Sequence, residues 1–164
     1  MPHGVDIRLA NHRRFWLYIR VFGAVSRRHL VTECQIDIRA LSQTYERDGY
    51  IGGVPILSPE SAAQHRASME AAEEQIGSLH YKSKAHTILI SPLQLATDPT
   101  VLDIVESIIG PDILLYNVTY IIKEANAPSH VSWHQDLTYW GLSHDDQVSM
   151  WLALTAVSAS HMDT

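Results

Sequence analysis

The first half of the chain carries apolar residues at helical spacing, in stretches bounded by residues that start or stop helices. Such spacing runs through residues 36–50, where glycines then interrupt it. The Ser-Pro-Glu sequence at residues 58–60 provides a capping serine, a first-turn proline and a glutamate that favours the positive end of a helix. We expect that helix to stop at Gly77. An Asp-Pro pair at residues 98–99 opens another helix, which ends at Gly110.

The second half of the chain is patterned for strands. Residues 113–123 are dense in Ile, Leu, Val, Tyr and Thr, and residues 131–137 and 148–157 predict two more strands. Residues 79–95 are expected to form a loop with one short strand at residues 87–90. Helices followed by antiparallel strands with short connections predict an α+β, mainly β fold, of the β-sandwich or jelly-roll type with an N-terminal helical buttress.

The N-terminal segment, residues 1–40, differs in composition from the rest of the chain. It carries seven Lys and Arg against three Asp and Glu, with apolar residues between the arginines. An organelle transit peptide and a basic amphipathic segment that lies on membranes are two functional interpretations. We favour a third, an extension that is not native to the domain, because the composition changes abruptly near residue 40.

Charge and cysteine content narrow the class of protein. The formal net charge is -6, and the acidic residues are concentrated after residue 40, which argues against nucleic acid as the main partner. The single cysteine, Cys34, permits no intrachain disulfide. No apolar run reaches the roughly 20 residues that span a bilayer, so no stable membrane insertion is expected. The chain is therefore expected to be cytoplasmic, with organelle targeting by residues 1–40 as an alternative.

His134 and Asp136 are the first candidates for chemistry. In an extended strand alternate side chains share a face, so the imidazole and the carboxylate project together. They would form two thirds of the 2-His-1-carboxylate triad that holds non-haem Fe(II). A hydrogen-bonded His-carboxylate couple, or a satisfied core histidine, explains the same two residues without a metal.

Four short motifs follow one another in order: Pro-Asp-Ile-Leu-Leu at 111–115, Tyr-Ile-Ile-Lys-Glu at 120–124, Trp-His-Gln-Asp-Leu-Thr-Tyr-Trp at 133–140 and Ser-Met-Trp-Leu-Ala-Leu at 149–154. Together they resemble the phytanoyl-CoA dioxygenase (PhyH-like) family of Fe(II)- and 2-oxoglutarate-dependent oxygenases. The resemblance implies a partial double-stranded β-helix (jelly roll, cupin-like) over residues 41–157. It also implies Fe(II) as cofactor, with 2-oxoglutarate and O2 as cosubstrates, and hydroxylation of a small organic substrate.

The resemblance assigns roles to seven residues, and to no catalytic residue beyond the metal ligands. They are His134 and Asp136 as iron ligands, Lys123, Trp151 and Asn117 as 2-oxoglutarate-binding residues, and Tyr139 and Trp140 as walls of the substrate pocket. A carboxylate at position 136 favours hydroxylation, because halogenating relatives replace it with a small residue. Ordinary core packing for Trp151 and a solvated strand-end position for Lys123 remain the alternatives.

The chain also departs from the family pattern. The family needs a distal histidine and an arginine for the far carboxylate of 2-oxoglutarate, yet His144 and His161 both follow too closely and Arg66 is the last arginine. We therefore expect an incomplete oxygenase domain, with a non-family tail at residues 158–164. Residues 148–157 would then form an open sheet edge, suited to a partner chain or to self-association. The alternative is a catalytically inactive fragment or degenerate paralogue.

Overall fold

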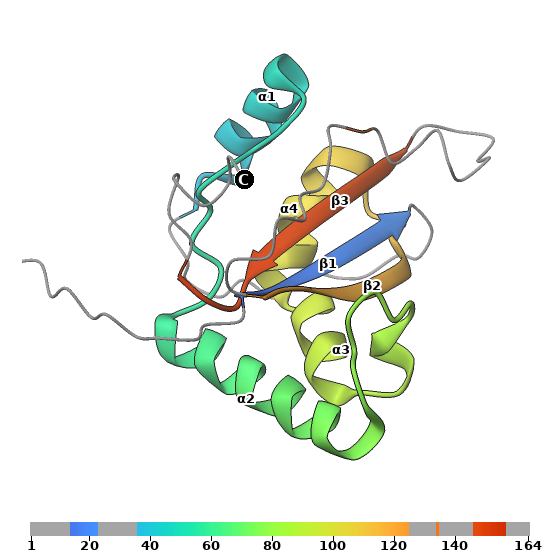
Figure 1. The fold of residues 1–164 in the computed structure, drawn as a ribbon. Coiled ribbons are helices and arrows are strands. Elements are labelled where there is room, and N and C mark those ends of the chain that lie inside the picture. The colour runs from blue at the N-terminus through green and yellow to red at the C-terminus, as the bar shows by residue number, and fades with distance from the viewer. Residues whose placement is uncertain (1–13, 23–35, 125–133, 135–145, 157–164) are drawn as a thin grey trace, which may run out of the picture.

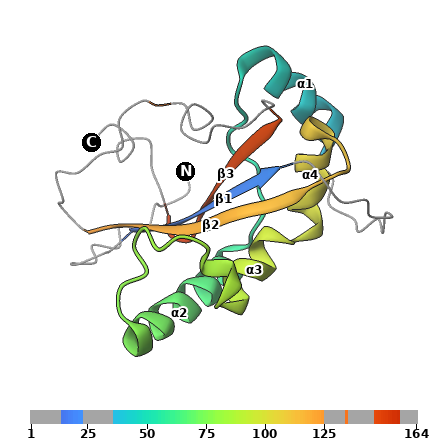
Figure 2. The ribbon, with the colours of Figure 1, turned by 90° about the vertical axis from the view of Figure 1, so that its right-hand side faces the viewer.

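The computed structural model describes residues 36–124, 134 and 146–156, together with the backbone of residues 14–22. A three-stranded sheet carries the helices α2, α3 and α4 on one of its faces (Figures 1 and 2). In chain order the elements are β1 (Arg14–Phe22), α1 (Ile38–Asp48), α2 (Pro59–Ile76), η1 (Ala85–Thr87), α3 (Ile90–Ala96), α4 (Pro99–Ile109), β2 (Leu114–Lys123) and β3 (Gln147–Ala153).

The three long helices are confirmed, and capping side chains set where they begin. The side chains of Asp37, Ser58 and Asp98 accept hydrogen bonds from backbone N–H groups in the first turns of α1, α2 and α4, at 3.0, 3.1 and 2.9 Å. Gly49 ends α1 with φ of 78°, a left-handed conformation that glycine adopts without steric cost. Local chemistry therefore decides these helix boundaries.

The predicted loop over residues 79–95 is wrong from Ala85 onward, and the short strand at residues 87–90 is wrong. The chain there forms η1 and then α3. A short apolar run is ambiguous between strand and helix, and packing resolves it in favour of a helix. Pro92, in the first turn of α3, is buried together with Leu95 and Ala96.

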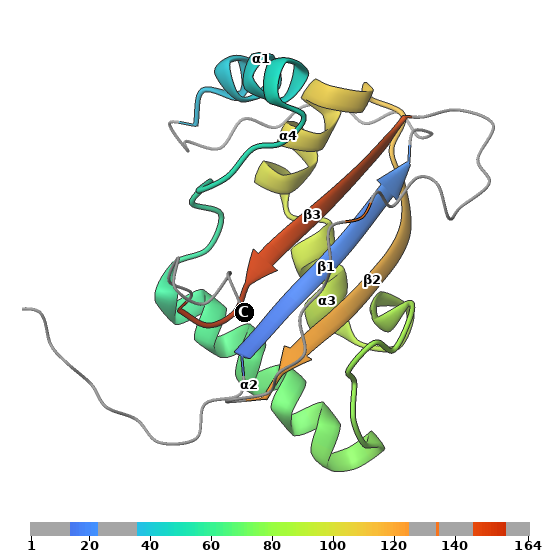
Figure 3. The ribbon, with the colours of Figure 1, turned by 45° about the horizontal axis from the view of Figure 1, so that its top comes forward.

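The sheet has the order β2-β1-β3, and both pairs are antiparallel (Figure 3). The predicted strands at residues 113–123 and 148–157 are confirmed as β2 and β3. The predicted strand at residues 131–137 lies outside the described residues, except for His134. The middle strand is β1, from residues 14–22. The sheet therefore combines one strand of the basic N-terminal segment with two strands of the chain after residue 40.

The two faces of the sheet have different surroundings. Side chains of β2 and β3 that point toward the helices are buried and join one hydrophobic cluster with residues of α2, α3 and α4. From the strands this cluster contains Val118, Tyr120, Ile122, Val148 and Leu152, and from the helical part Met69, Leu79, Leu95 and Val105. We call the opposite side, to which Asn117, Thr119, Lys123, Ser149 and Trp151 belong, the helix-free face.

The outer edges of the sheet also differ. The segment that follows α2 covers the outer edge of β2. The Tyr81 N–H donates to the Tyr120 carbonyl at 3.0 Å, and the Ile122 N–H donates to His80 Nδ1 at 2.9 Å. On β3 no segment of the described chain pairs with the outer edge. An open edge on β3 that could receive another strand stays a prediction.

No helix in the described part of the chain has both the length and the apolar character that crossing a bilayer requires.

A half-buried histidine connects two of the helices beneath the sheet. His65 Nδ1 of α2 lies 2.8 Å from Ser91 Oγ of α3. Burial lowers the pKa of His65, against an opposing effect of Asp98. Burial also lowers the pKa of His86, and the Lys84 ammonium lowers it further. Both rings therefore resist protonation in the folded chain.

This resistance predicts a pH-dependent stability. Unfolded histidine has a pKa of about 6.5, so the unfolded chain binds more protons than the folded chain when the pH falls below that value. The contribution of His65 and His86 to the free energy of unfolding should therefore decrease from about pH 7 to pH 5. Urea unfolding across this range should show a shallower decrease for a His65→Asn/His86→Asn double variant. An unchanged slope would assign the pH dependence to other groups.

Candidate functional site

Three of the predicted cofactor-binding residues share the helix-free face. Lys123 and Asn117 belong to β2 and Trp151 belongs to β3, with β1 between them. In the register of β1, Asn117 is opposite Arg20 and Trp151 is opposite Tyr18, and cross-strand partners in an antiparallel sheet point to the same face. The fold thus gathers these positions on one side, away from the core.

Asn117 has a structural task there. Its side chain is buried, and its Oδ1 accepts hydrogen bonds from Ser83 Oγ at 3.0 Å and from the Lys84 backbone N–H at 2.6 Å. Its Nδ2 donates to Thr119 Oγ1 at 3.0 Å. The side-chain amide ties the segment after α2 to the sheet, and a role for Asn117 in cofactor binding stays a prediction.

Lys123 lies at the far end of β2 and is half-buried. It is six residues from Asn117, a separation of about 20 Å along an extended strand. A five-carbon dicarboxylate is shorter than this distance. Asn117 and Lys123 therefore cannot both contact one molecule of 2-oxoglutarate through short side-chain contacts.

Trp151 is 47% exposed and borders a large groove of about 1190 Å³. Every residue from Gln147 to Ala156 lines this groove, although alternate residues of a strand point to opposite faces. The groove must therefore follow the outer edge of β3. Its opposite wall is formed by residues 49–58, between α1 and α2, by the first half of α2, and by α4. We call this feature the β3-edge groove.

Arg66 is the one charged residue among the described residues that line the β3-edge groove. Its Nε is buried without a hydrogen-bond partner in the described chain, and an ion pair joins it to Glu70 Oε1 at 3.6 Å. Gln147, also in the lining, has a buried Oε1 without such a partner among the described residues. Neither residue was among the predicted site residues. Arg66 could have been noticed as one of few basic residues in the acidic part of the chain. Nothing in the sequence around Gln147 marks it as a site residue.

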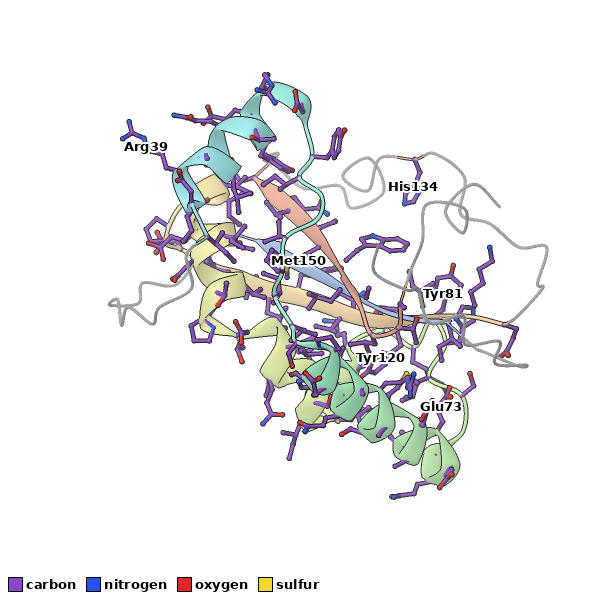
Figure 4. All side chains as sticks on the ribbon, turned by 90° about the vertical axis from the view of Figure 1, so that its left-hand side faces the viewer. Arg39, Glu73, Tyr81, Tyr120, His134 and Met150 are labelled. Atoms are coloured by element: carbon purple, nitrogen blue, oxygen red, sulfur yellow. The ribbon has the colours of Figure 1, made fainter. Side chains whose placement is uncertain are left out.

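The predicted metal ligands are only partly described. His134 is exposed and lies on the opposite side of the sheet from Glu73 of α2 (Figure 4), and hence on the side of the helix-free face. Asp136, Tyr139 and Trp140 fall outside the described residues. Within the described ranges no three residues among His, Cys, Asp and Glu are grouped to hold a metal ion. The His134–Asp136 pair accordingly stays a prediction.

Comparison with known proteins identifies one relationship. A family model described as Phytanoyl-CoA dioxygenase (PhyH) matches residues 45–160. No curated protein and no solved structure shows significant similarity to the chain. The matched region contains every predicted site residue and begins after β1.

Proposed function

Because the chain belongs to the phytanoyl-CoA dioxygenase family, we propose that it forms part of an Fe(II)- and 2-oxoglutarate-dependent oxygenase that hydroxylates a small organic substrate. The observation that carries this proposal is the family match over residues 45–160, which spans both His134 and Asp136. A jelly roll is part of the proposal. Its support is a sheet with one face packed on helices and an opposite face that no helix of the described residues covers.

The donor set suits the metal. An imidazole and a carboxylate are the ligand types of the facial triad, and His134 is exposed to solvent on the helix-free side of the sheet. His134 and Asp136 would hold the metal as two of three protein ligands. A bound iron would supply the activation of O2, coupled to decarboxylation of 2-oxoglutarate.

The other predicted residues would bind and shield the reactants. The Lys123 ammonium is suited to pair with a carboxylate of 2-oxoglutarate, because charge-assisted hydrogen bonds are stronger than neutral ones. The Trp151 indole would exclude water beside the β3-edge groove, and Tyr139 and Trp140 would shape the entrance for the substrate. The apolar lining of the groove favours a substrate with apolar surface, and Arg66 would face any anionic part of that substrate.

Metal binding by His134 is the direct test. Titration calorimetry with Co(II) in place of Fe(II) should give one binding event for the full chain and a loss of affinity of about tenfold or more for His134→Ala, because loss of an outer-shell partner alone costs about 10–100-fold. His144→Ala is the matched control, since it removes a nearby histidine outside the predicted ligand set, and it should bind like the parent. Equal affinity in His134→Ala and the parent would refute the site.

A second candidate function is a non-catalytic chain that acts through its open sheet edge. One observation favours it: within the described ranges no segment pairs with the outer edge of β3. A succinate assay separates the candidates. Succinate release that requires both Fe(II) and 2-oxoglutarate would favour the oxygenase, whereas metal binding without succinate release, together with concentration-dependent sedimentation, would favour association through the edge.

A further inference from the structure

The middle strand of the sheet comes from outside the family-matched part of the chain. The match covers residues 45–160 and includes β2 and β3, whereas β1 ends at Phe22. In the order β2-β1-β3, the two family strands do not pair with each other. They are two strand spacings apart, or about 10 Å, which is too far for direct backbone hydrogen bonds. The family-matched part thus contains a slot one strand wide.

The two strands that border this slot, β2 and β3, both pack against helices. β2 packs against η1 and α3, and β3 packs against α4. Val118 of β2 and Val148 of β3 belong to one buried cluster with Leu95 and Val105 of the helices. Each of the two strands bordering the slot thus has contacts of its own with the helical layer, in addition to its pairing with β1.

β1 occupies the slot and pairs antiparallel with the strand on each side of it. Nine residues of β1 pair with β2, and seven pair with β3. A register shift between Arg20 and Val21 leaves Tyr116 of β2 as the extra residue, and such bulges fix the register of a strand. Because strand addition relies on main-chain hydrogen bonds, a strand that enters from another molecule can form the same ladders.

The connection from β1 to the rest of the chain is long. Fifteen residues separate Phe22 from Ile38, enough to span about 50 Å when extended. A connection of this length is long enough for β1 of one copy to reach the slot of another. We propose that the slot between β2 and β3 is a strand-acceptor site and that residues 14–22 are its exchangeable ligand, which the same segment of a second copy of the chain can replace.

Exchange of a labelled strand tests this inference. A protease site placed between residues 23 and 35 of the full chain allows β1 to be cut from its domain after folding. The cut protein should retain the N-terminal fragment in gel filtration. A fluorescent peptide of residues 12–24 should then replace the fragment, seen as a rise in anisotropy that the unlabelled peptide reverses.

Proline variants of the peptide test whether backbone pairing holds it. Successive N–H groups of a middle strand point to opposite neighbours, so Tyr18→Pro and Ile19→Pro each remove a donor from a different ladder. Each should weaken binding by about tenfold or more, because proline removes a ladder hydrogen bond and is excluded from the middle strands of sheets. Tyr18→Thr retains the N–H and a β-favouring side chain, and should bind within a few-fold of the parent.

Three results would overturn the proposal. The first is a cut protein that loses its fragment without any change in its unfolding transition, because β1 would then not complete the sheet. The second is a proline peptide that binds like the parent, because binding would then not use strand pairing. The third is a cut protein that excludes the labelled peptide until it unfolds, because the strand would then be fixed. None of these results depends on metal binding by His134.

Discussion

Truncation of Tyr120 to alanine should lower the free energy of unfolding by about 3–5 kcal/mol, the range found when a large buried aromatic ring is removed. The Tyr120 side chain is fully buried in β2, within the cluster that joins the sheet to α2, α3 and α4. Removal of its ring should leave a cavity, because closely packed neighbours relax only partly into the space. Chemical denaturation monitored by circular dichroism measures the change, and a loss below about 1 kcal/mol would contradict the packing.

Tyr120→Phe is the matched control, because it keeps the ring and removes only the hydroxyl. Burial raises the pKa of the Tyr120 phenol to about 12. Ser91 lies near enough to lower this pKa, but no hydrogen bond of acceptable geometry joins the hydroxyl to Ser91 or to any other described residue. Loss of a buried hydroxyl without a partner should be neutral or should stabilise the fold by up to about 1 kcal/mol. If Phe were as harmful as Ala, the hydroxyl rather than the ring would hold the core together.

Asn117→Ala should lower the free energy of unfolding by about 2–3 kcal/mol. The substitution removes three hydrogen bonds and leaves the Lys84 N–H and the Thr119 hydroxyl without their acceptor and donor in a buried setting. Thermal unfolding detects the loss. Hydrogen exchange should show increased exchange at Ser83 and Lys84, the segment that Asn117 holds against the sheet.

Ser83→Ala measures one of the three hydrogen bonds by itself. It removes the bond from the exposed Ser83 hydroxyl and leaves the bonds of Asn117 to Lys84 and Thr119 intact. It should cost well under half of the loss seen for Asn117→Ala. Asn117→Ala should also leave Co(II) binding unchanged, since the side chain serves the fold. A variant of unchanged stability and weakened 2-oxoglutarate binding would instead support the cofactor role that the family resemblance implies.

The helices with strong boundaries could be predicted from the sequence. The capping residues Asp37, Ser58 and Asp98 act on the first turn of their own helix, so no distant contact is needed to recognise them. The runs that became β2 and β3 were equally clear, because their dense β-branched and aromatic residues suit a sheet. The short helix α3 was missed because burial of Leu95 and Ala96 overrides a local pattern that fits either state.

For the site, the residue pattern around His134, Lys123 and Trp151 was enough to identify the family, and the match over residues 45–160 confirms that identification. The family could be identified from the sequence because the predicted site residues lie within short motifs. The pattern did not reveal that Asn117 anchors Ser83 and Lys84, since a side chain's partners depend on segments brought together only by folding. The β3-edge groove with Arg66 was hidden for the same reason.

The sequence by itself determined the family, the main helix boundaries and the strand character of β2 and β3, because these follow from local chemistry and from the order of motifs. Only the tertiary structure decided which strands are neighbours. The basic N-terminal segment appeared separate from the domain by composition, yet residues 14–22 pair with both β2 and β3. Strand pairing joins segments that are distant along the chain through backbone hydrogen bonds, which leave little trace in side-chain composition.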